Sequence, residues 1–250
     1  MSNHTKRKFV GNVKLDFIIS NLIENNEKNN YQDLHHTKYT NGYLQLEDNT
    51  VIGGFIYLHN QKQIFIPEPE PSILYFTNAE SKLVNILKLR DSIFQFKPAE
   101  HSIHDLSHIF FNFFQLSSDY IINLFTSIEA FNNSLIPDGF EFDYKKEKYG
   151  KTDTQRSVDF MTKVKRAVPE IMQKSFVKEF QDKYDFLLKL KELRDNTIHT
   201  KNMYKGFPSS YRELYKNYLD FDFGHSYNIT KDYFNFYMPN WIENCNCEEK

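Results

Sequence analysis

The sequence predicts an α+β protein in which an all-α bundle of four or five helices follows a small antiparallel β-rich segment. Short β-branched and aromatic runs separated by turn residues occupy residues 39–77, which is typical of strands. From about residue 100, apolar residues recur at steps of three and four, which is typical of amphipathic helices. We expect a β-rich N-terminal segment of unknown role at 1–98, the bundle at 99–205 and a helical extension at 206–250 that packs on the bundle.

The β-rich segment contains three or four candidate strands, at residues 43–46, 51–58, 63–66 and 73–76. Turn-forming Asp-Asn and His-Asn-Gln-Lys sequences separate the first three, and a proline-rich link precedes the fourth. Because proline lacks an amide hydrogen, the prolines at 67, 69 and 71 should end the third strand and hold the link extended. Residues 13–23 are apolar enough for a strand or a short helix.

The bundle itself should contain four helices. The first covers residues 103–115, and the second begins at the serine pair 117–118, whose hydroxyls can cap a helix, and ends before Pro-Asp-Gly at 137–139. After a charged loop, the threonines at 152 and 154 are candidate caps for the third helix. The fourth and longest runs from Pro169 to Ile198 with one apolar face. Short connections between such helices favour an antiparallel bundle.

The charge of the chain limits the classes of partner. A net charge of −2 argues against a protein covered in phosphate-binding groups, because non-specific nucleic-acid affinity needs many Lys and Arg contacts. Residues 145–174 nonetheless hold nine basic and four acidic side chains, a local net charge of +5. They form either an ordinary solvated helix face or part of an RNA-binding surface. The candidate RNA-binding residues are Lys163, Lys165, Arg166, Lys191 and Lys201.

The N-terminus lacks the apolar run of a signal peptide, and no stretch is long and apolar enough to span a membrane. We therefore expect a cytoplasmic protein without a membrane partner.

One pair of residues near the end of the fourth helix could carry chemistry. Arg194 falls inside the apolar arc of that helix, and His199 falls just past its opposite edge. Burying an unpaired guanidinium is costly, so Arg194 needs an acidic partner, a phosphate or a polar cleft. Glu129, which lies among apolar residues of the second helix, is the candidate acid.

Arginine and histidine together can cleave RNA without a metal. A guanidinium donates two parallel hydrogen bonds to a phosphate, and an imidazole, with an ordinary pKa of about 6.5, has both forms accessible near neutrality. His199 would take the proton of a 2′-hydroxyl, that oxygen would attack the adjacent phosphorus, and Arg194 would stabilise the developing charge. Asp195 lies one helical turn before His199 and could orient its imidazole. The alternative is that His199 only complements the helix dipole while Arg194 pairs with an acid.

Two segments resemble the HEPN superfamily, whose signature is an Arg, a polar residue and then a His late in a long helix. Residues 193–199 (LRDNTIH) are similar to that signature, and residues 125–133 (FTSIEAFNN) are similar to the early helix of many members. The resemblance covers about residues 100–205. In one toxin branch a Tyr follows the His by two places, whereas this chain has Lys201 there and a Tyr only at 204, which makes that branch doubtful.

The resemblance implies a bundle that forms a homodimer, with two Arg/His motifs in one cleft and no cofactor. Many members are metal-independent ribonucleases of toxin–antitoxin or abortive-infection systems, which implies RNA and an antitoxin or other protein as partners. Carried over to this chain, Arg194 and His199 would be catalytic and Asp195 would be the supporting polar residue. Other members are inactive, so a non-catalytic dimerisation or binding module is the alternative function.

A metal-dependent hydrolase is a third hypothesis. His101, His104 and His108 would share one face of a helix, and the last two have the spacing of a metal-binding pair. Asp105 stands where the metalloprotease motif requires Glu, so the sequence favours a site without metal.

Overall fold

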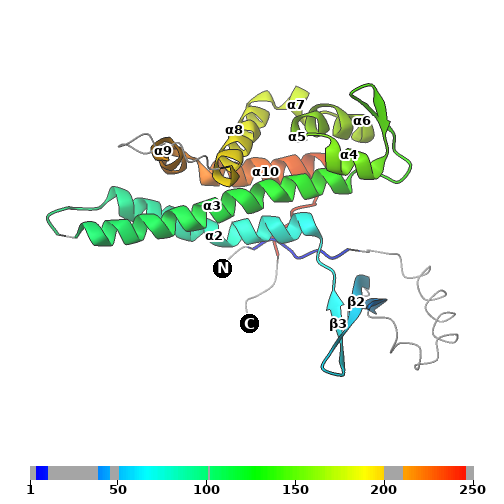
Figure 1. Cartoon of the computed structure of the whole chain (residues 1–250), viewed down its shortest axis with the longest axis horizontal. Helices are drawn as coiled ribbons and strands as arrows, with labels where there is room; N and C mark the ends of the chain where they lie inside the picture. Colours follow the sequence, from blue (N-terminus) through cyan, green and yellow to red (C-terminus); the bar gives the residue numbers. More distant parts are fainter. Residues whose placement is uncertain (1–3, 11–38, 46–50, 101, 200–210, 246–250) are drawn as a thin grey trace. The chain divides into compact units, whose positions relative to one another are not determined.

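The computed structural model describes residues 4–10, 39–45, 51–100, 102–199 and 211–245 (Figure 1). The chain forms two compact units, one from residues 7–73 and the other from residues 1–6 together with 74–250. The second unit is mainly helical and the first contains an antiparallel sheet, which confirms the α+β class. The division lies after Ile73, so residues 74–98, which the sequence grouped with the β-rich segment, belong to the helical unit.

Three of the four candidate strands are confirmed. β1 (Tyr39–Gln45), β2 (Val51–His59) and β3 (Lys62–Pro67) form an antiparallel sheet in the order β1-β2-β3. Asn60 and Gln61 join β2 to β3 with φ values of 48° and 65°, the left-handed conformation of a tight hairpin turn. Gly54 is required in β2 because a Cβ there would overlap the carbonyl oxygen of Ile66 and the ring of Phe65.

The fourth candidate strand is wrong, because residues 73–76 lie in the helix α2 (Pro71–Phe94). Pro71 occupies the first helical position, where its missing amide hydrogen costs nothing. The buried residues Ile73, Phe76, Ala79 and Ile86 then follow helical spacing. A short apolar run between prolines and an Asn is compatible with either a strand or a helix. The helical spacing of the buried residues that follow makes it a helix.

The first two helices predicted for the bundle are one continuous helix, α3 (Ile103–Ser134). Its N-cap is Ser102, which forms a reciprocal capping box with Asp105. Ser117 is buried in mid-helix, and the hydroxyl of Ser118 donates to the carbonyl of Phe114 one turn earlier. The prediction that these serines start a new helix is therefore wrong.

The charged loop after α3 contains the hairpin of β4 (Phe142–Tyr144) and β5 (Glu147–Tyr149). α4 (Lys151–Ser157) follows, with Gly150 rather than a threonine at its N-cap. Next come α5 (Phe160–Thr162), the π-helix η2 (Lys163–Ala167) and α6 (Val168–Met172). Pro169 lies in the first turn of α6, as predicted.

The long fourth helix predicted from Pro169 to Ile198 is broken into three. α6 ends at Met172, its C-cap Gln173 has a left-handed φ of 53°, and Ser175 caps α7 (Phe176–Glu179). After Phe180, α8 (Gln181–Ile198) carries the Arg194/His199 segment.

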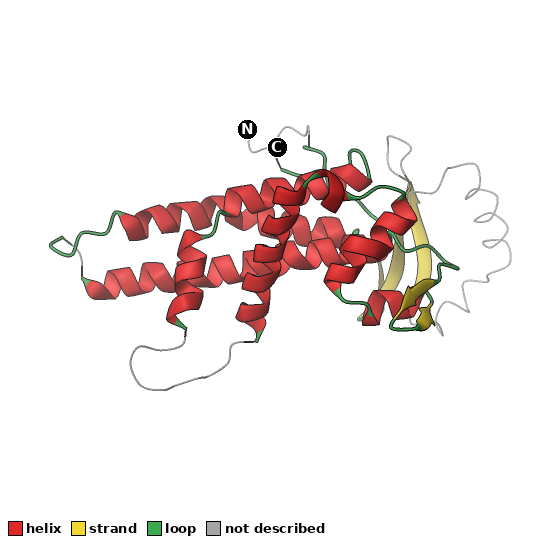
Figure 2. Ribbon diagram, turned by 90° about the horizontal axis from the view of Figure 1, so that it is seen from above, coloured by secondary structure: helices red, strands yellow, loops and turns green. Residues whose placement is uncertain are grey.

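The C-terminal segment contributes two helices, α9 (Arg212–Asp220) and α10 (Phe223–Tyr237). α10 lies alongside α3 and is part of the core rather than an external addition (Figures 1 and 2). The hydroxyl of Tyr233 donates to Oδ1 of Asn132 at 2.6 Å, and that of Tyr120 donates to the carbonyl of Phe223 at 2.8 Å. α2 lies along α3, with the Asn78 amide donating to Oδ1 of Asn123 (Figure 2).

Residues 4–6 pair with residues 243–245 through backbone hydrogen bonds. The amide of Lys6 donates to the carbonyl of Glu243, and the amide of Cys245 donates to that of His4, both at 2.7 Å. Thr5 donates from its amide and its hydroxyl to the carboxylate of Glu80 on α2, each at 3.0 Å.

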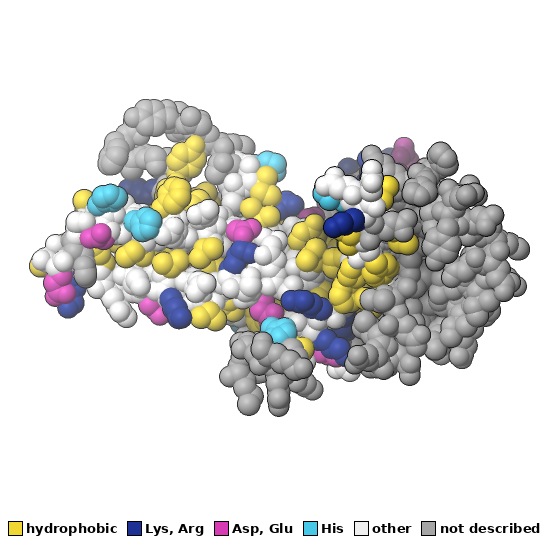
Figure 3. Space-filling view, turned by 90° about the horizontal axis from the view of Figure 1, so that it is seen from below, with side chains coloured by type: hydrophobic (Ala, Val, Ile, Leu, Met, Phe, Trp, Pro, Cys, Tyr) yellow, Lys and Arg dark blue, Asp and Glu magenta, His cyan; other side chains and the backbone are white. Residues whose placement is uncertain are grey.

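None of the described helices combines the length and the apolar character that crossing a membrane requires. On the face that Figure 3 shows, the described Lys and Arg side chains are scattered among acidic and hydrophobic ones.

Candidate active site

Packing fixes α8 on the bundle and places the predicted pair at its C-terminal end. Its buried side chains recur at steps of three and pack against α3 and α10. They are Tyr184, Leu187, Leu190 and Leu193. Arg194 follows directly at the edge of this buried face, and 24% of its side chain is exposed.

Three groups hold the Arg194 guanidinium. Nη2 donates to Oε2 of Glu129 on α3 at 3.2 Å, and Nη1 donates to Oδ1 of Asp195 at 2.8 Å. The guanidinium carbon lies 4.6 Å from the ring centroid of Phe125, a cation–π distance. Nε is buried and makes no hydrogen bond among the described residues. The predicted Glu129–Arg194 pair is thus confirmed, and it fixes the guanidinium in one orientation.

The carboxylate of Asp195 accepts hydrogen bonds from cationic side chains of its own helix. Its carboxylate accepts from Nζ of Lys191 at 2.5 Å and from Arg194. Burial raises the pKa of Asp195, but the hydrogen bonds from Lys191 and Arg194 outweigh it and leave that pKa below its ordinary value. The hydrogen bonds that the structure records for this carboxylate come from Lys191 and Arg194, and the expectation that Asp195 orients the His199 imidazole stays a prediction.

His199 is the C-cap of α8, with φ −101° and ψ 43°, and its side chain is exposed. Its backbone amide donates to the carbonyl of Asp195 at 2.9 Å. Five residues of α-helix rotate the side-chain direction by about 140°. One copy of the chain therefore directs Arg194 and His199 to different sides of α8.

Lys163, a predicted RNA-binding residue, lies in the interior beside this site. Its side chain is buried in η2, and Nζ donates to Oδ1 of Asn133 at 2.9 Å and to the carbonyl of Gln155 at 2.5 Å. Burial lowers the pKa of Lys163, against the raising effect of the Glu129 and Asp159 charges. Lys163 is therefore buried rather than part of an open basic surface, and its predicted contact with RNA stays a prediction.

We call Glu129, Lys163, Lys191, Arg194 and Asp195 the Arg194 cluster. Its members touch or act on one another through the contacts given above, and with every group ionised the cluster has a formal charge of +1. A phosphate that approached the exposed edge of Arg194 would meet a pre-oriented cation in a cluster that is not fully neutralised.

The other predicted RNA-binding residues are dispersed. Lys165 and Arg166 are exposed, with Lys165 Nζ 5.2 Å from the ring centroid of Tyr184 and Arg166 donating to the carbonyl of Asp143. Lys191 belongs to the Arg194 cluster. Lys201 lies outside the described residues.

The histidine triplet gives no metal site in the described part of the chain. His104 and His108 are exposed on α3, and His101 lies outside the described residues. The Asp105 carboxylate is engaged with Ser102 at the helix start. Within the described ranges, no three His, Cys, Asp or Glu side chains are grouped closely enough to hold an ion.

No protein-family model matches this chain, and no curated protein or solved structure is significantly similar to it. The resemblance of residues 125–133 and 193–199 to HEPN proteins therefore stays a prediction.

Proposed function

We propose that this protein is a metal-independent endoribonuclease of the HEPN type that acts as a homodimer, in the role of a toxin or abortive-infection effector. The observation that carries the proposal is the Arg194 guanidinium, which Glu129 and Asp195 hold in a fixed orientation at the edge of the bundle. An exposed His199 follows on the same helix. This combination supplies a preorganised cation and an accessible base.

The chemistry is an internal transfer at phosphorus. His199 takes the proton of a ribose 2′-hydroxyl, and the oxygen bonds to the adjacent phosphorus. The bond to the 5′-oxygen breaks, leaving a 2′,3′-cyclic phosphate, and an imidazolium returns the proton to the departing oxygen. Arg194 stabilises the negative charge on the phosphoryl oxygens in the transition state.

Two copies are needed because the two side chains leave α8 in directions that differ by about 140°. Across a two-fold axis, Arg194 of one copy and the partner subunit's His199 can meet at a single phosphate. A symmetric dimer repeats this arrangement, so that it holds two equivalent composite sites.

Labelled RNA incubated with the full chain in EDTA tests the proposal. Cleavage should persist in EDTA, leave cyclic phosphate ends and disappear in Arg194→Ala and in His199→Ala. Arg212→Ala and His108→Ala are matched controls, since both side chains are exposed and lie outside the Arg194 cluster. Cell toxicity on expression should be relieved by the first two substitutions only. Cleavage that chelation abolishes, or that both Arg194→Ala and His199→Ala retain, would contradict the proposal.

A non-catalytic dimerisation or binding module is the second candidate. The hydrogen bonds of Arg194 to two carboxylates and its place over Phe125 would also suit a purely structural arginine. Absence of cleavage for any RNA, with a stable dimer in solution, would favour this function.

A further inference from the structure

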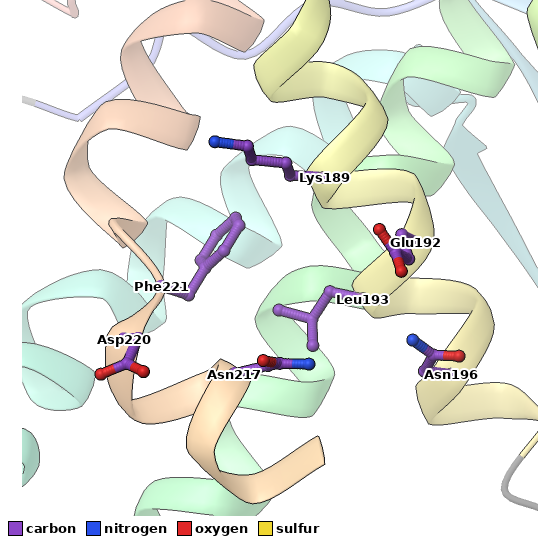
Figure 4. Close-up of a pocket in the computed structure, with 7 residues that line it drawn as sticks. All are labelled: Lys189, Glu192, Leu193, Asn196, Asn217, Asp220 and Phe221. Atoms are coloured by element: carbon purple, nitrogen blue, oxygen red, sulfur yellow. The ribbon is translucent and has the colours of Figure 1, made fainter. Parts of the chain in front are cut away.

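A pocket of about 310 Å³ lies between α8 and α9 (Figure 4). Its apolar part comes from Leu193 and Phe221, both of which are buried. Five exposed polar side chains surround this apolar part. They are Lys189, Glu192, Asn196, Asn217 and Asp220. The volume is at the lower end of the range for pockets that hold small organic groups.

These polar side chains have no partner in the part of the chain that the structure describes. Within the described residues, none of the five takes part in a hydrogen bond or an ion pair. Together they offer two amides, two carboxylates and one ammonium group, a formal charge of −1. Such a set is poor for a phosphate, but it suits a neutral ligand that has several hydrogen-bond donors and at least one acceptor.

We propose that the pocket binds a nucleobase that carries an exocyclic amino group: adenine, cytosine or guanine rather than uracil. A base is flat, so Leu193 and Phe221 can cover one of its faces. Glu192 or Asp220 can accept a hydrogen bond from the amino group, while the amides of Asn196 and Asn217 can donate and accept at the base edge. Uracil has no amino group to offer these carboxylates.

The position of the pocket on α8 links it to the proposed chemistry. Asn196 precedes His199 by three residues and Glu192 precedes it by seven, so all three lie on one side of the helix. A nucleotide whose base occupies the pocket would bring its ribose or that of a neighbour toward His199. The pocket would then select the base beside the bond that is cut, an inference that rests on the proposed ribonuclease function.

Direct binding tests the pocket without using catalysis. The full chain with His199→Ala is titrated with adenosine, cytidine, guanosine and uridine, observed by ligand NMR. We expect saturable binding of the three amino-bearing nucleosides and at least about ten-fold weaker binding of uridine, as for the loss of a paired base-edge contact. Asn217→Leu should weaken the tight binders by about ten-fold. The matched control Asn228→Leu, an exposed Asn on α10 that does not line the pocket, should leave them unchanged. Thermal melts verify that both variants fold.

A second measurement separates this inference from the ribonuclease proposal. RNAs that differ in one base beside the cut are given to the wild type and to Asn217→Leu with His199 intact. Cleavage that avoids uracil in the wild type and loses this preference in the variant supports the pocket. Metal-independent cleavage with no nucleoside binding and no base preference would overturn the pocket and leave the ribonuclease standing. Nucleoside binding without any cleavage would support the pocket and overturn the ribonuclease proposal. Binding of uridine as tight as that of the other nucleosides would overturn the pocket.

Discussion

Arg194 makes contacts that a lysine could not make together, because its fork reaches Glu129 and Asp195 while its plane lies over Phe125. The conformation of this residue is therefore determined before any ligand arrives. Glu129 comes from a different helix, so the pair also fastens α8 to α3.

The Glu129–Arg194 pair should contribute measurably to stability. In a double-mutant cycle of Arg194→Ala and Glu129→Ala, we expect a coupling free energy of about 1 kcal/mol, since both groups are only partly exposed. Urea unfolding of the four proteins gives this value. The exposed Arg212–Glu213 pair is the control and should show no measurable coupling. An equally small value for Glu129–Arg194 would mean that the pair does not fasten the helices.

Asp195 should make stability depend on pH in the acidic range. Its pKa in the folded protein is held below the ordinary value, so its contribution is present in full above about pH 4 and is lost as the pH falls through the folded pKa. Asp195→Asn should lower the free energy of unfolding at pH 7 by about 1 kcal/mol or less, because the group is partly exposed. The difference between wild type and variant should shrink below pH 4. A constant difference in urea unfolding across that range would contradict this assignment.

At the scale of the element, α3 runs without interruption past Ser117, whose hydroxyl is buried and makes no hydrogen bond among the described residues. A buried hydroxyl without a partner is destabilising, and alanine also has the higher helix propensity. The sign of the change in the free energy of unfolding on substitution of Ser117 therefore tells a helix interior from a helix start.

Ser117→Ala should raise the free energy of unfolding, by about 0.5–1.5 kcal/mol. An N-cap serine would give a loss of about 1 kcal/mol instead. Thermal or urea unfolding provides the measurement. Ser118→Ala, which removes a hydroxyl that bonds to the helix's own carbonyls, is the neighbouring control and should change stability less.

The sequence predicted elements well where local signals agree and poorly where long-range packing decides. The hairpin of β2 and β3 was predictable because two β-branched and aromatic runs flank a short polar turn. The break at Gln173 was not, because no Gly or Pro marks it and a Gln seldom adopts the left-handed conformation that it has there. In the site, Glu129 and Arg194 were predictable partners because each interrupts an apolar face. The burial of Lys163 was not predictable, because the shifted register of a π-helix leaves no pattern in the sequence.

For the whole molecule, the proposed composite site would make activity depend on the assembly of two copies. The chain should sediment with twice its mass of 30.0 kDa, and cleavage per chain should fall on dilution below the dimer dissociation constant. A fully active monomer would exclude a site that is shared between copies.

Mixed dimers give a sharper form of this test. Arg194→Ala and His199→Ala chains, each inactive alone, should regain about a quarter of wild-type activity when they are unfolded and refolded together. Random pairing makes about half of the dimers mixed, and each mixed dimer has one intact composite site out of two. Refolding either variant alone is the control, and a mixture that stays inactive would contradict a site built from one Arg194 and one His199.

The pairing of residues 4–6 with Glu80 and residues 243–245 has a topological consequence. Residues 1–6 belong to the helical unit, residues 7–73 form the sheet unit, and the chain re-enters the helical unit at residue 74. The sheet unit is therefore an insertion, joined to the helical unit at both of its ends. An N-terminal truncation at residue 73 would therefore also remove a piece of the helical unit, exposing the carboxylate of Glu80 and the backbone of residues 243–245. A cleaner excision would replace residues 7–73 with a short flexible linker and keep the first residues in place.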